Sequence, residues 1–412
     1  MKRKLPFSVE DINKLKKQYN TPFYIYDEKA LISRIEAVNN AFAWNSNYKE
    51  YYAIKALPNP HILKILKKHS CGFDAASMCE IVLADKVKSK DIMFTSNNPT
   101  KEDYLMALQA KAIINFDAYE QIDNLLDVLK QTEYAFPNSV CFRYNPGRFE
   151  IDASFIGELE SSKFGMSKKQ LIEGIQKAKE LGAKRFGIHA MLAGNALDEN
   201  YYALEAELLF KLAKEIKEIL NINIDFFDLA GGVGIAYKED QKEVDIKKVG
   251  NKVKEVYKKY FKDKDYQPAI FTEMGRYISG PIGYLVTSVT NVKETYRKYI
   301  GVDASMADLM RPGMYGSYHH IEVLNNSKKK DIYDVVGPIC ENNDKFAIQR
   351  QLNVVNKNDI LVICDAGAHS RSMGFNYNGR LRAGELLLTK ENKYKLIRRK
   401  ETIEDYLATI VE

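Results

Sequence analysis

The sequence predicts an α/β fold, a closed (β/α)8 TIM barrel followed by an all-β C-terminal domain. Two observations predict it. Between about residues 28 and 275, short apolar runs alternate with longer stretches of helical period, which is typical of parallel strands covered by helices. After residue 280 the pattern changes to β-rich runs with turn residues between them.

Eight short apolar runs are the candidate barrel strands. They span residues 50–55, 71–75, 91–95, 112–116, 140–144, 186–191, 226–229 and 269–272. Between most of them lie helical stretches, such as 171–181 and 200–220, with apolar residues at spacings of three and four. Eight strand and helix units in succession favour a closed barrel.

The predicted domain boundaries follow from the same change of pattern. Residues 28–280 form the barrel, and residues 281–412 form a β-barrel or sandwich that includes the runs 284–289 and 359–364. The N-terminal segment 1–27 contributes the short run 23–26 to the β domain.

Composition excludes several classes of function. The chain has 412 residues, 45% apolar and 28% charged, and its net charge of +6 comes from basic residues interleaved with acidic ones. Nucleic-acid and membrane partners are therefore not indicated. No run approaches the roughly 20 apolar residues of a membrane span, so we expect a cytoplasmic protein. The five cysteines show no CxxC spacing, which favours neither a disulfide framework nor a metal site.

Polar residues follow the predicted strands, where a barrel enzyme does its chemistry. Lys55 ends the first strand, Asp74 and Ser77 follow the second, Arg143 ends the fifth and His189 lies in the sixth. An amine at a strand end can form a Schiff base with a carbonyl cofactor. By itself, such a lysine is more often simply solvated.

Glycines follow the last two predicted strands. The seventh strand runs into Ala230-Gly231-Gly232-Val233-Gly234 and the eighth into Glu273-Met274-Gly275-Arg276. Phosphate sites of such barrels tend to lie there, which fits Gly231, Gly232 and Arg276. A glycine-rich dinucleotide-binding loop normally follows the first strand of its fold. The glycines here follow the seventh strand, which argues against that alternative. Glu273 is equally well explained as an ion-pair partner of Arg276.

Four ordered motifs together resemble a known family. They are Tyr52 to Ala56, Phe73 to Ser77, Glu273 to Arg276 and Cys340-Glu341-Asn342. This set resembles the fold-type III pyridoxal-phosphate (PLP) decarboxylases, the alanine-racemase-like barrel group, and is most similar to the diaminopimelate decarboxylases. The likeness runs from about residue 20 to the C-terminus and includes residues 310–316, 365–368 and 376–378.

The resemblance implies roles in cofactor binding and catalysis. Lys55 would hold PLP as a Schiff base, Glu273 would face the pyridine nitrogen, and Cys340 would reprotonate the carbanion. A buried, inert cysteine is the alternative for Cys340. The implied cofactor site is completed by Asp74, Ser77, Arg143, Met191, Gly231, Gly232, Gly275, Arg276 and Tyr377.

The resemblance also implies the substrate. Arg276, Arg311 and Tyr315 would bind a distal carboxylate and Glu341 a distal ammonium, with Tyr377 beside them. This set implies decarboxylation of meso-2,6-diaminopimelate to L-lysine by a homodimer with shared active sites. The alternatives are a related decarboxylase acting on D-lysine, D-ornithine, L-ornithine or carboxynorspermidine, and a non-catalytic regulator on the same fold.

The chain departs from the family pattern at three places. The family's His-Ile-Gly-Ser run is Met191-Leu192-Ala193-Gly194 here, Ala230 replaces a glycine, and Met274 replaces the proline of Glu-Pro-Gly-Arg. A thioether can cover a ring face, so we expect the histidine's stacking role to pass to Met191. We assign no role to His320 or His369.

Overall fold

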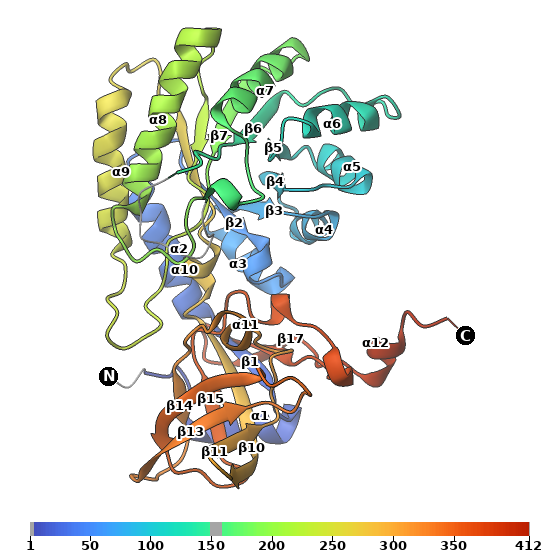
Figure 1. Ribbon diagram of the computed structural model, residues 1–412, viewed down its shortest axis with the longest axis vertical. Coiled ribbons are helices and arrows are strands. Elements are labelled where there is room, and N and C mark those ends of the chain that lie inside the picture. Colours follow the sequence, from blue (N-terminus) through green and yellow to red (C-terminus); the bar gives the residue numbers. More distant parts are fainter. Residues whose placement is uncertain (1–3, 149–158, 412) are drawn as a thin grey trace. The chain divides into compact units, whose positions relative to one another are not determined.

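A computed structural model describes residues 4–148 and 159–411 of the chain and divides it into two compact units (Figure 1). The barrel unit consists of Ile32–Ile235 and Glu243–Tyr277. The β unit consists of the residues up to Leu31, Ala236–Lys242 and the residues from Ile278 onward.

The barrel unit contains a closed barrel of parallel strands. β9 pairs with β2, which closes the barrel and confirms the predicted fold class. Each strand lies within two residues of its predicted bounds; the strands are β2 (Lys49–Ala53), β3 (Gly72–Ala75), β4 (Ile92–Ser96), β5 (Ile113–Phe116), β6 (Ser139–Arg143), β7 (Arg185–His189), β8 (Phe226–Asp228) and β9 (Ala269–Thr272).

Helices surround the barrel strands (Figure 1). They begin at recognisable signals: Ser167 forms a capping box at the start of α7 and Thr100 one at the start of α5. Apolar faces hold them against the strands. The helices are α2 (Glu28–Phe42), α3 (Pro60–Lys68), α4 (Met78–Lys86), α5 (Lys101–Gln109), α6 (Gln121–Leu129), α7 (Lys168–Glu180), α8 (Tyr201–Leu220), α9 (Ile246–Tyr260) and the short α10 (Gly275–Ser279).

The β unit is built on a sheet in the order β14-β13-β11-β10-β1-β16-β17, with β15 pairing β10 and β12. Helix α1 (Val9–Tyr19) packs Ile12 and Leu15 onto an apolar cluster of this sheet. Its strands are β1 (Phe23–Asp27), β10 (Gly283–Glu294), β11 (Lys298–Val302), β12 (Ile321–Val323), β13 (Lys330–Val336), β14 (Lys345–Asn353), β15 (Ile360–Ile363), β16 (Gly384–Leu388) and β17 (Tyr394–Arg398); α11 (Arg311–Tyr315) and α12 (Ile403–Leu407) are short.

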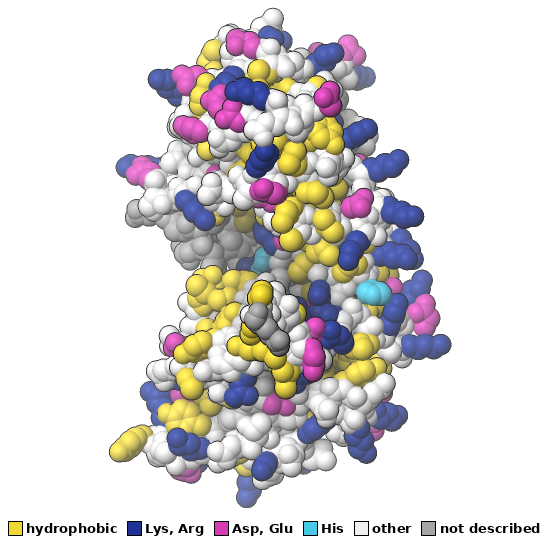
Figure 2. Space-filling model, turned by 90° about the vertical axis from the view of Figure 1, so that its right-hand side faces the viewer, with side chains coloured by type: hydrophobic (Ala, Val, Ile, Leu, Met, Phe, Trp, Pro, Cys, Tyr) yellow, Lys and Arg dark blue, Asp and Glu magenta, His cyan; other side chains and the backbone are white. Residues whose placement is uncertain are grey.

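The surface is mixed in charge. On the face drawn in Figure 2, acidic side chains are scattered among the basic ones. Among residues 4–148 and 159–411, no helix is both long enough and apolar enough to cross a membrane.

Candidate active site

The barrel interior has an apolar floor. Tyr51, Met93, Cys141, Phe226 and Phe271 belong to one buried cluster inside the barrel. The rings of Tyr51 and Phe271 are 4.9 Å apart and those of Phe226 and Phe271 4.8 Å apart. This floor closes the barrel below the C-terminal ends of its strands.

A layer of polar side chains lies next to the apolar floor, towards the C-terminal ends of the strands. Side chains two residues apart on a strand share a face, so the residue two positions after a floor residue also points inward. That step leads from Cys141 to Arg143, from Phe226 to Asp228 and from Phe271 to Glu273. In β3 and β7 the same layer holds Asp74 and His189. All five side chains are largely buried: Asp74, Arg143, His189, Asp228 and Glu273.

Lys55 lies in a 3-10 turn (Ile54–Ala56) directly after β2, not in the strand as predicted. Its Nζ donates to Oδ2 of Asp74 at 3.0 Å, and 49% of its side chain is exposed. Burial opposes the charge of the amine, but the carboxylates of Asp74 and Glu273 outweigh it and raise the pKa of Lys55. The turn therefore points an anchored amine into the polar layer.

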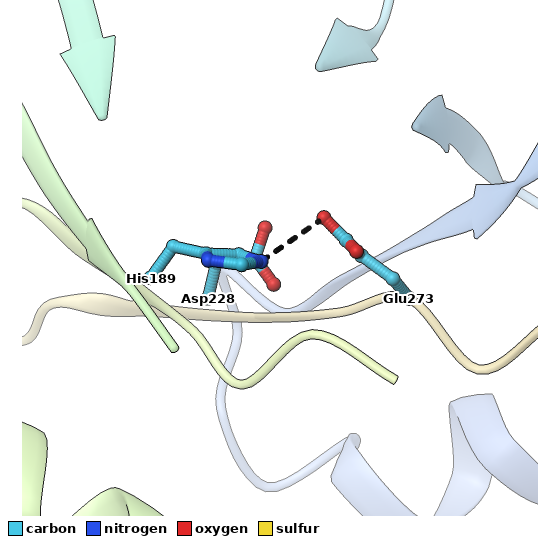
Figure 3. A group of neighbouring side chains, drawn as sticks. All are labelled: His189, Asp228 and Glu273. Atoms are coloured by element: carbon cyan, nitrogen blue, oxygen red, sulfur yellow. Dashed lines mark ion pairs between the residues drawn. The ribbon is translucent and has the colours of Figure 1, made fainter. Parts of the chain in front are cut away.

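Glu273, Asp228 and His189 form a buried cluster at the centre of this layer (Figure 3). Their donor atoms lie within 4.8 Å of one another, and Nε2 of His189 is 3.8 Å from Oε1 of Glu273, the distance marked in Figure 3. Among the described residues, Oε1 of Glu273 and Nδ1 of His189 have no hydrogen-bond partner. Each buried polar atom without a partner calls for an explanation, and a bound ligand is one that suits a cluster at the strand ends of a barrel.

The protonation states in this cluster follow from burial. Burial, and next the charge of Arg143, lower the pKa of His189 to about 3, so its imidazole is neutral. Burial and the neighbouring Glu273 raise the pKa of Asp228 well above its ordinary value. Burial also raises the pKa of Glu273, but the charges of Lys55 and Arg143 oppose that rise. Two adjacent carboxyl groups do not both ionise readily, so we assign the proton to Asp228 and the charge to Glu273.

The side chain of Arg143 is held by residues of two loops, Asp117 after β5 and Phe164 after β6. Its Nη1 donates to Oδ1 of Asp117 at 3.0 Å, and its guanidinium carbon lies 4.5 Å from the ring centre of Phe164. Oδ2 of Asp117 accepts the backbone N–H of Gly165. The guanidinium is thereby held at the barrel mouth with a defined orientation.

The loops that follow β7 and β8 pair with each other. Ala196 donates its N–H to the carbonyl of Gly232 at 2.7 Å and accepts that of Gly234 at 2.8 Å. Gly232 has a φ of +101°, and a Cβ there would lie 2.8 Å from the carbonyl oxygen of Ala193. Only glycine fits this close approach. Gly232 therefore presents backbone without a side chain at the place where we expect the phosphate.

Met191 and Tyr201 shape the loop after β7. Met191 lies in that loop and not in the strand as predicted, and its methyl group is 3.8 Å from where a Cβ of Gly231 would stand. The buried hydroxyl of Tyr201 accepts the N–H groups of Leu192 and Ala193 at 3.3 and 3.1 Å. Tyr201 therefore holds the segment in which this chain lacks the family's histidine and serine.

The remaining predicted residues of the barrel unit lie at helix starts. Ser77 precedes α4 at its N-cap position, and Gly275 opens α10, followed by Arg276. A Cβ on Gly275 would lie 2.8 Å from the Cβ of Ala56. The start of α10 therefore packs against the turn that carries Lys55.

The predicted site residues of the β unit lie on short segments, some of which contact each other. Arg311 and Tyr315 lie on α11, with the Arg311 guanidinium 5.8 Å from the Tyr315 ring centre and donating to Ser317. The N–H of Cys340 donates to Oδ1 of Asn378, next to Tyr377, at 2.6 Å. A Cβ on Gly313 of α11 would lie 2.2 Å from the carbonyl oxygen of Asn343, so α11 packs against the loop that contains Cys340 and Glu341.

Comparison with known proteins identifies the family. The family described as pyridoxal-dependent decarboxylase, pyridoxal binding domain, matches residues 28–280. Protein TabA of Pseudomonas amygdali pv. tabaci is 38% identical over 97% of this chain and 93% of that protein. Diaminopimelate decarboxylase of Methanothermobacter thermautotrophicus is 34% identical over 96% of this chain and 93% of its own length. A crystal structure of diaminopimelate decarboxylase from Methanocaldococcus jannaschii in complex with L-lysine superposes with a TM-score of 0.90, at 31% identity over 97% of this chain and 94% of that one.

The chain belongs to the pyridoxal-dependent decarboxylases and is a carboxy-lyase with PLP as its cofactor. The barrel site fits that cofactor. Within residues 4–148 and 159–411, Oε1 of Glu273 has no hydrogen-bond partner and could accept a protonated ring nitrogen. The anchored amine of Lys55 lies in the same layer, and the glycine loop follows the adjoining strand β8. The cluster of His189, Asp228 and Glu273 also has the spacing of metal ligands, but its orphaned carboxylate is equally suited to a pyridinium nitrogen.

Sequence reasoning missed three residues of this site. Asp228 could have been found, because it stands two positions after the floor residue Phe226 at a strand end. Tyr201 is one aromatic residue among several at the start of α8, and no local pattern distinguishes it. Glu50 is an acidic residue in β2 whose partners Thr272 and Met274 are distant in the sequence, so no local pattern reveals it.

Proposed function

We propose that the chain converts meso-2,6-diaminopimelate to L-lysine and CO2. The observation that carries this proposal is the near full-length likeness to diaminopimelate decarboxylases, including one solved with L-lysine. L-lysine is diaminopimelate that has lost one carboxyl group. Bound PLP supplies a sink for the electron pair left behind when CO2 departs.

In this proposal the barrel residues hold the cofactor. The Lys55 amine attaches it, with Asp74 keeping the side chain aimed into the polar layer. Glu273, charged beside a protonated Asp228, would accept a hydrogen bond from the ring nitrogen and keep that nitrogen protonated. Gly231, Gly232 and Arg276 would bind the phosphate, and Met191 would cover one face of the ring.

The residues of the β unit keep the roles that the resemblance implies. Arg311, only 4% exposed, has a planar guanidinium suited to a carboxylate, and Tyr315 lies beside it. Glu341 would bind the distal ammonium, Tyr377 would contact cofactor and substrate, and Cys340 would donate the proton that replaces CO2. The exposed thiol of Cys340 argues against the alternative of a buried, inert cysteine.

A second candidate is a related amino-acid decarboxylase with another substrate. The relative TabA shares more identity with this chain than the diaminopimelate decarboxylase above, and its name states no reaction. The departures at Met191, Ala230 and Met274 also lie in the cofactor site. The alternative of a non-catalytic regulator is not supported, because the chain is a decarboxylase by family and has Lys55, Glu273 and Cys340.

The test is CO2 release by the purified, PLP-loaded protein. Diaminopimelate is offered in parallel with both enantiomers of lysine and ornithine, and with carboxynorspermidine. We expect CO2 from diaminopimelate only, with L-lysine as the product. Release from a simple diamino acid at a comparable kcat/KM would contradict the proposal and favour the second candidate.

The homodimer implied by the resemblance is likewise proposed. Analytical ultracentrifugation of the loaded protein should give twice the mass of the 47.2 kDa chain. A monomer that turns over substrate at full rate would contradict it. The cytoplasmic location stays a prediction.

A further inference from the structure

Glu50 is a buried acidic side chain in an otherwise apolar strand. It lies in β2, is 1% exposed, and sits on the outer face of the barrel, because its neighbour Tyr51 points to the interior floor. A carboxyl group in such a place is costly unless hydrogen bonds satisfy it. Its partners therefore tell what it does.

Both carboxyl oxygens of Glu50 bind residues that flank Glu273. Oε1 accepts the backbone N–H of Met274 at 2.7 Å, and Oε2 accepts the hydroxyl of Thr272 at 2.6 Å. Tyr48 completes the set, with its hydroxyl 2.7 Å from that of Thr272. The strand register makes this possible, since Glu50 is the Cα partner of Thr272 across β2 and β9.

The backbone of Glu273 is fixed from its other sides as well. Its N–H donates to the carbonyl of Ala230 at 2.6 Å, and its carbonyl accepts the N–H of Gly275 at 2.8 Å. Glu50 adds hydrogen bonds to the residues on either side of Glu273, Thr272 and Met274. The carboxylate of Glu273 thereby projects into the polar layer from a backbone held at every position.

We propose that Glu50 is a positioning residue that fixes Glu273 opposite the cofactor's ring nitrogen through Thr272 and Met274. It touches neither cofactor nor substrate. The inference rests on the proposed role of Glu273 and is independent of which amino acid is the substrate.

The protonation of Glu50 suits this task. Burial, and to a smaller extent the charge of Glu273, raise its pKa to about 8 against the opposing hydrogen bonds from Thr272 and Met274. At neutral pH it is therefore largely protonated. It holds the backbone without placing a second negative charge behind Glu273.

Met274 takes part in the same hydrogen-bond network as Glu50. A proline at position 274 has no N–H and could not donate to Glu50. The departure of this chain from a Glu-Pro-Gly-Arg motif therefore supplies the donor that the buried carboxyl group needs. Glu50 and Met274 should depend on each other.

The experiment compares Glu50→Leu, Met274→Pro and the double variant as loaded, full-length proteins. Two quantities are measured: the release of PLP on dilution, and the 15N chemical shift of the ring nitrogen in isotope-labelled PLP. We expect Met274→Pro, which removes one buried hydrogen bond of Glu50, to bind PLP about tenfold more weakly. Glu50→Leu also removes the hydrogen bond from Thr272 and should bind PLP at least as weakly. The double variant should be no weaker than Glu50→Leu alone, because that variant already lacks the interaction that Met274→Pro removes.

Matched controls separate positioning from stability. Glu273→Gln gives the 15N shift of a ring nitrogen without its carboxylate, and the signals of Glu50→Leu and Met274→Pro should move towards it. Asp225→Leu removes another barrel carboxylate, which accepts the N–H of Phe186, and should leave the 15N signal unchanged. If Glu50→Leu does not fold, Thr272→Val removes one tie at constant shape and should move the signal in the same direction.

Two results would overturn the inference in distinguishable ways. An unchanged 15N signal and PLP affinity in Glu50→Leu or Thr272→Val, with a strong effect of Glu273→Gln, would show that Glu50 is only structural. No effect of Glu273→Gln itself would remove Glu273 from the cofactor site, and the proposed function would lose that residue too.

Discussion

The Nζ atom of Lys55, in the turn after β2, lies 3.0 Å from Oδ2 of Asp74 in the neighbouring strand β3. The other oxygen of Asp74 is buried and has no hydrogen-bond partner within the described residues. This relationship places the only lysine of the predicted cofactor site at the rim of a polar layer centred on Glu273.

Tyr201→Phe should weaken PLP binding. The hydroxyl accepts two backbone N–H groups of the loop after β7, and its loss leaves them without that acceptor. A cost of about 1–3 kcal/mol would loosen the loop and release PLP about tenfold faster. Tyr104→Phe removes a buried hydroxyl bound to the carbonyl of Gln121, and serves as the control that lowers stability without changing PLP affinity. Unchanged PLP release in Tyr201→Phe would refute the role of Tyr201.

Ala230→Gly should leave stability nearly unchanged. Ala230 has a φ of +49°, where a Cβ costs about 1 kcal/mol. Glycine relieves that strain but gains about as much entropy in the unfolded chain, so the free energy of unfolding should change by less than about 0.5 kcal/mol. Ala37→Gly, within helix α2, should cost about 1 kcal/mol. Urea denaturation compares the two; an equal loss at both positions would be inconsistent with strain at Ala230.

Glu50 should make stability depend on pH. Its folded pKa of about 8 exceeds the ordinary value of 4.5, so the folded protein binds the proton more tightly than the unfolded chain. Its contribution is therefore fully present below pH 4.5 and is lost as pH rises towards 8. Relative to Glu50→Gln, the free energy of unfolding should fall between pH 5 and 8 by about 1 kcal/mol per pH unit. Parallel pH profiles for the two proteins would show that Glu50 is ionised in the folded state.

Arg311→Lys should raise the KM for diaminopimelate at least about tenfold. Lysine keeps the charge but loses the planar fork that binds a carboxylate at two points. Arg350→Lys changes another arginine of the β unit, which stacks on Tyr318, and should leave KM unchanged. Steady-state kinetics with CO2 detection measures both. An unaltered KM in Arg311→Lys would remove this residue from the proposed substrate clamp.

The eight barrel strands were predictable because each is a short apolar run with a breaker after it. The inward alternation also made Asp74, Arg143 and Glu273 predictable from their strand ends. Lys55 was placed in the strand, whereas Pro58 and Pro60 allow only a short 3-10 turn before α3 begins. Glu50 could not be predicted, because its partners Thr272 and Met274 lie more than 200 positions away and join it only when β9 closes on β2.

The most direct test of the central claim is to find which lysine carries PLP. Borohydride reduction of the loaded protein fixes the cofactor to that side chain, and peptide mass spectrometry locates it. We expect the label on Lys55, and in Lys55→Ala neither the label nor the absorbance band of bound cofactor. A label on any other lysine of the unaltered protein, or a cofactor band that persists in Lys55→Ala, would contradict it.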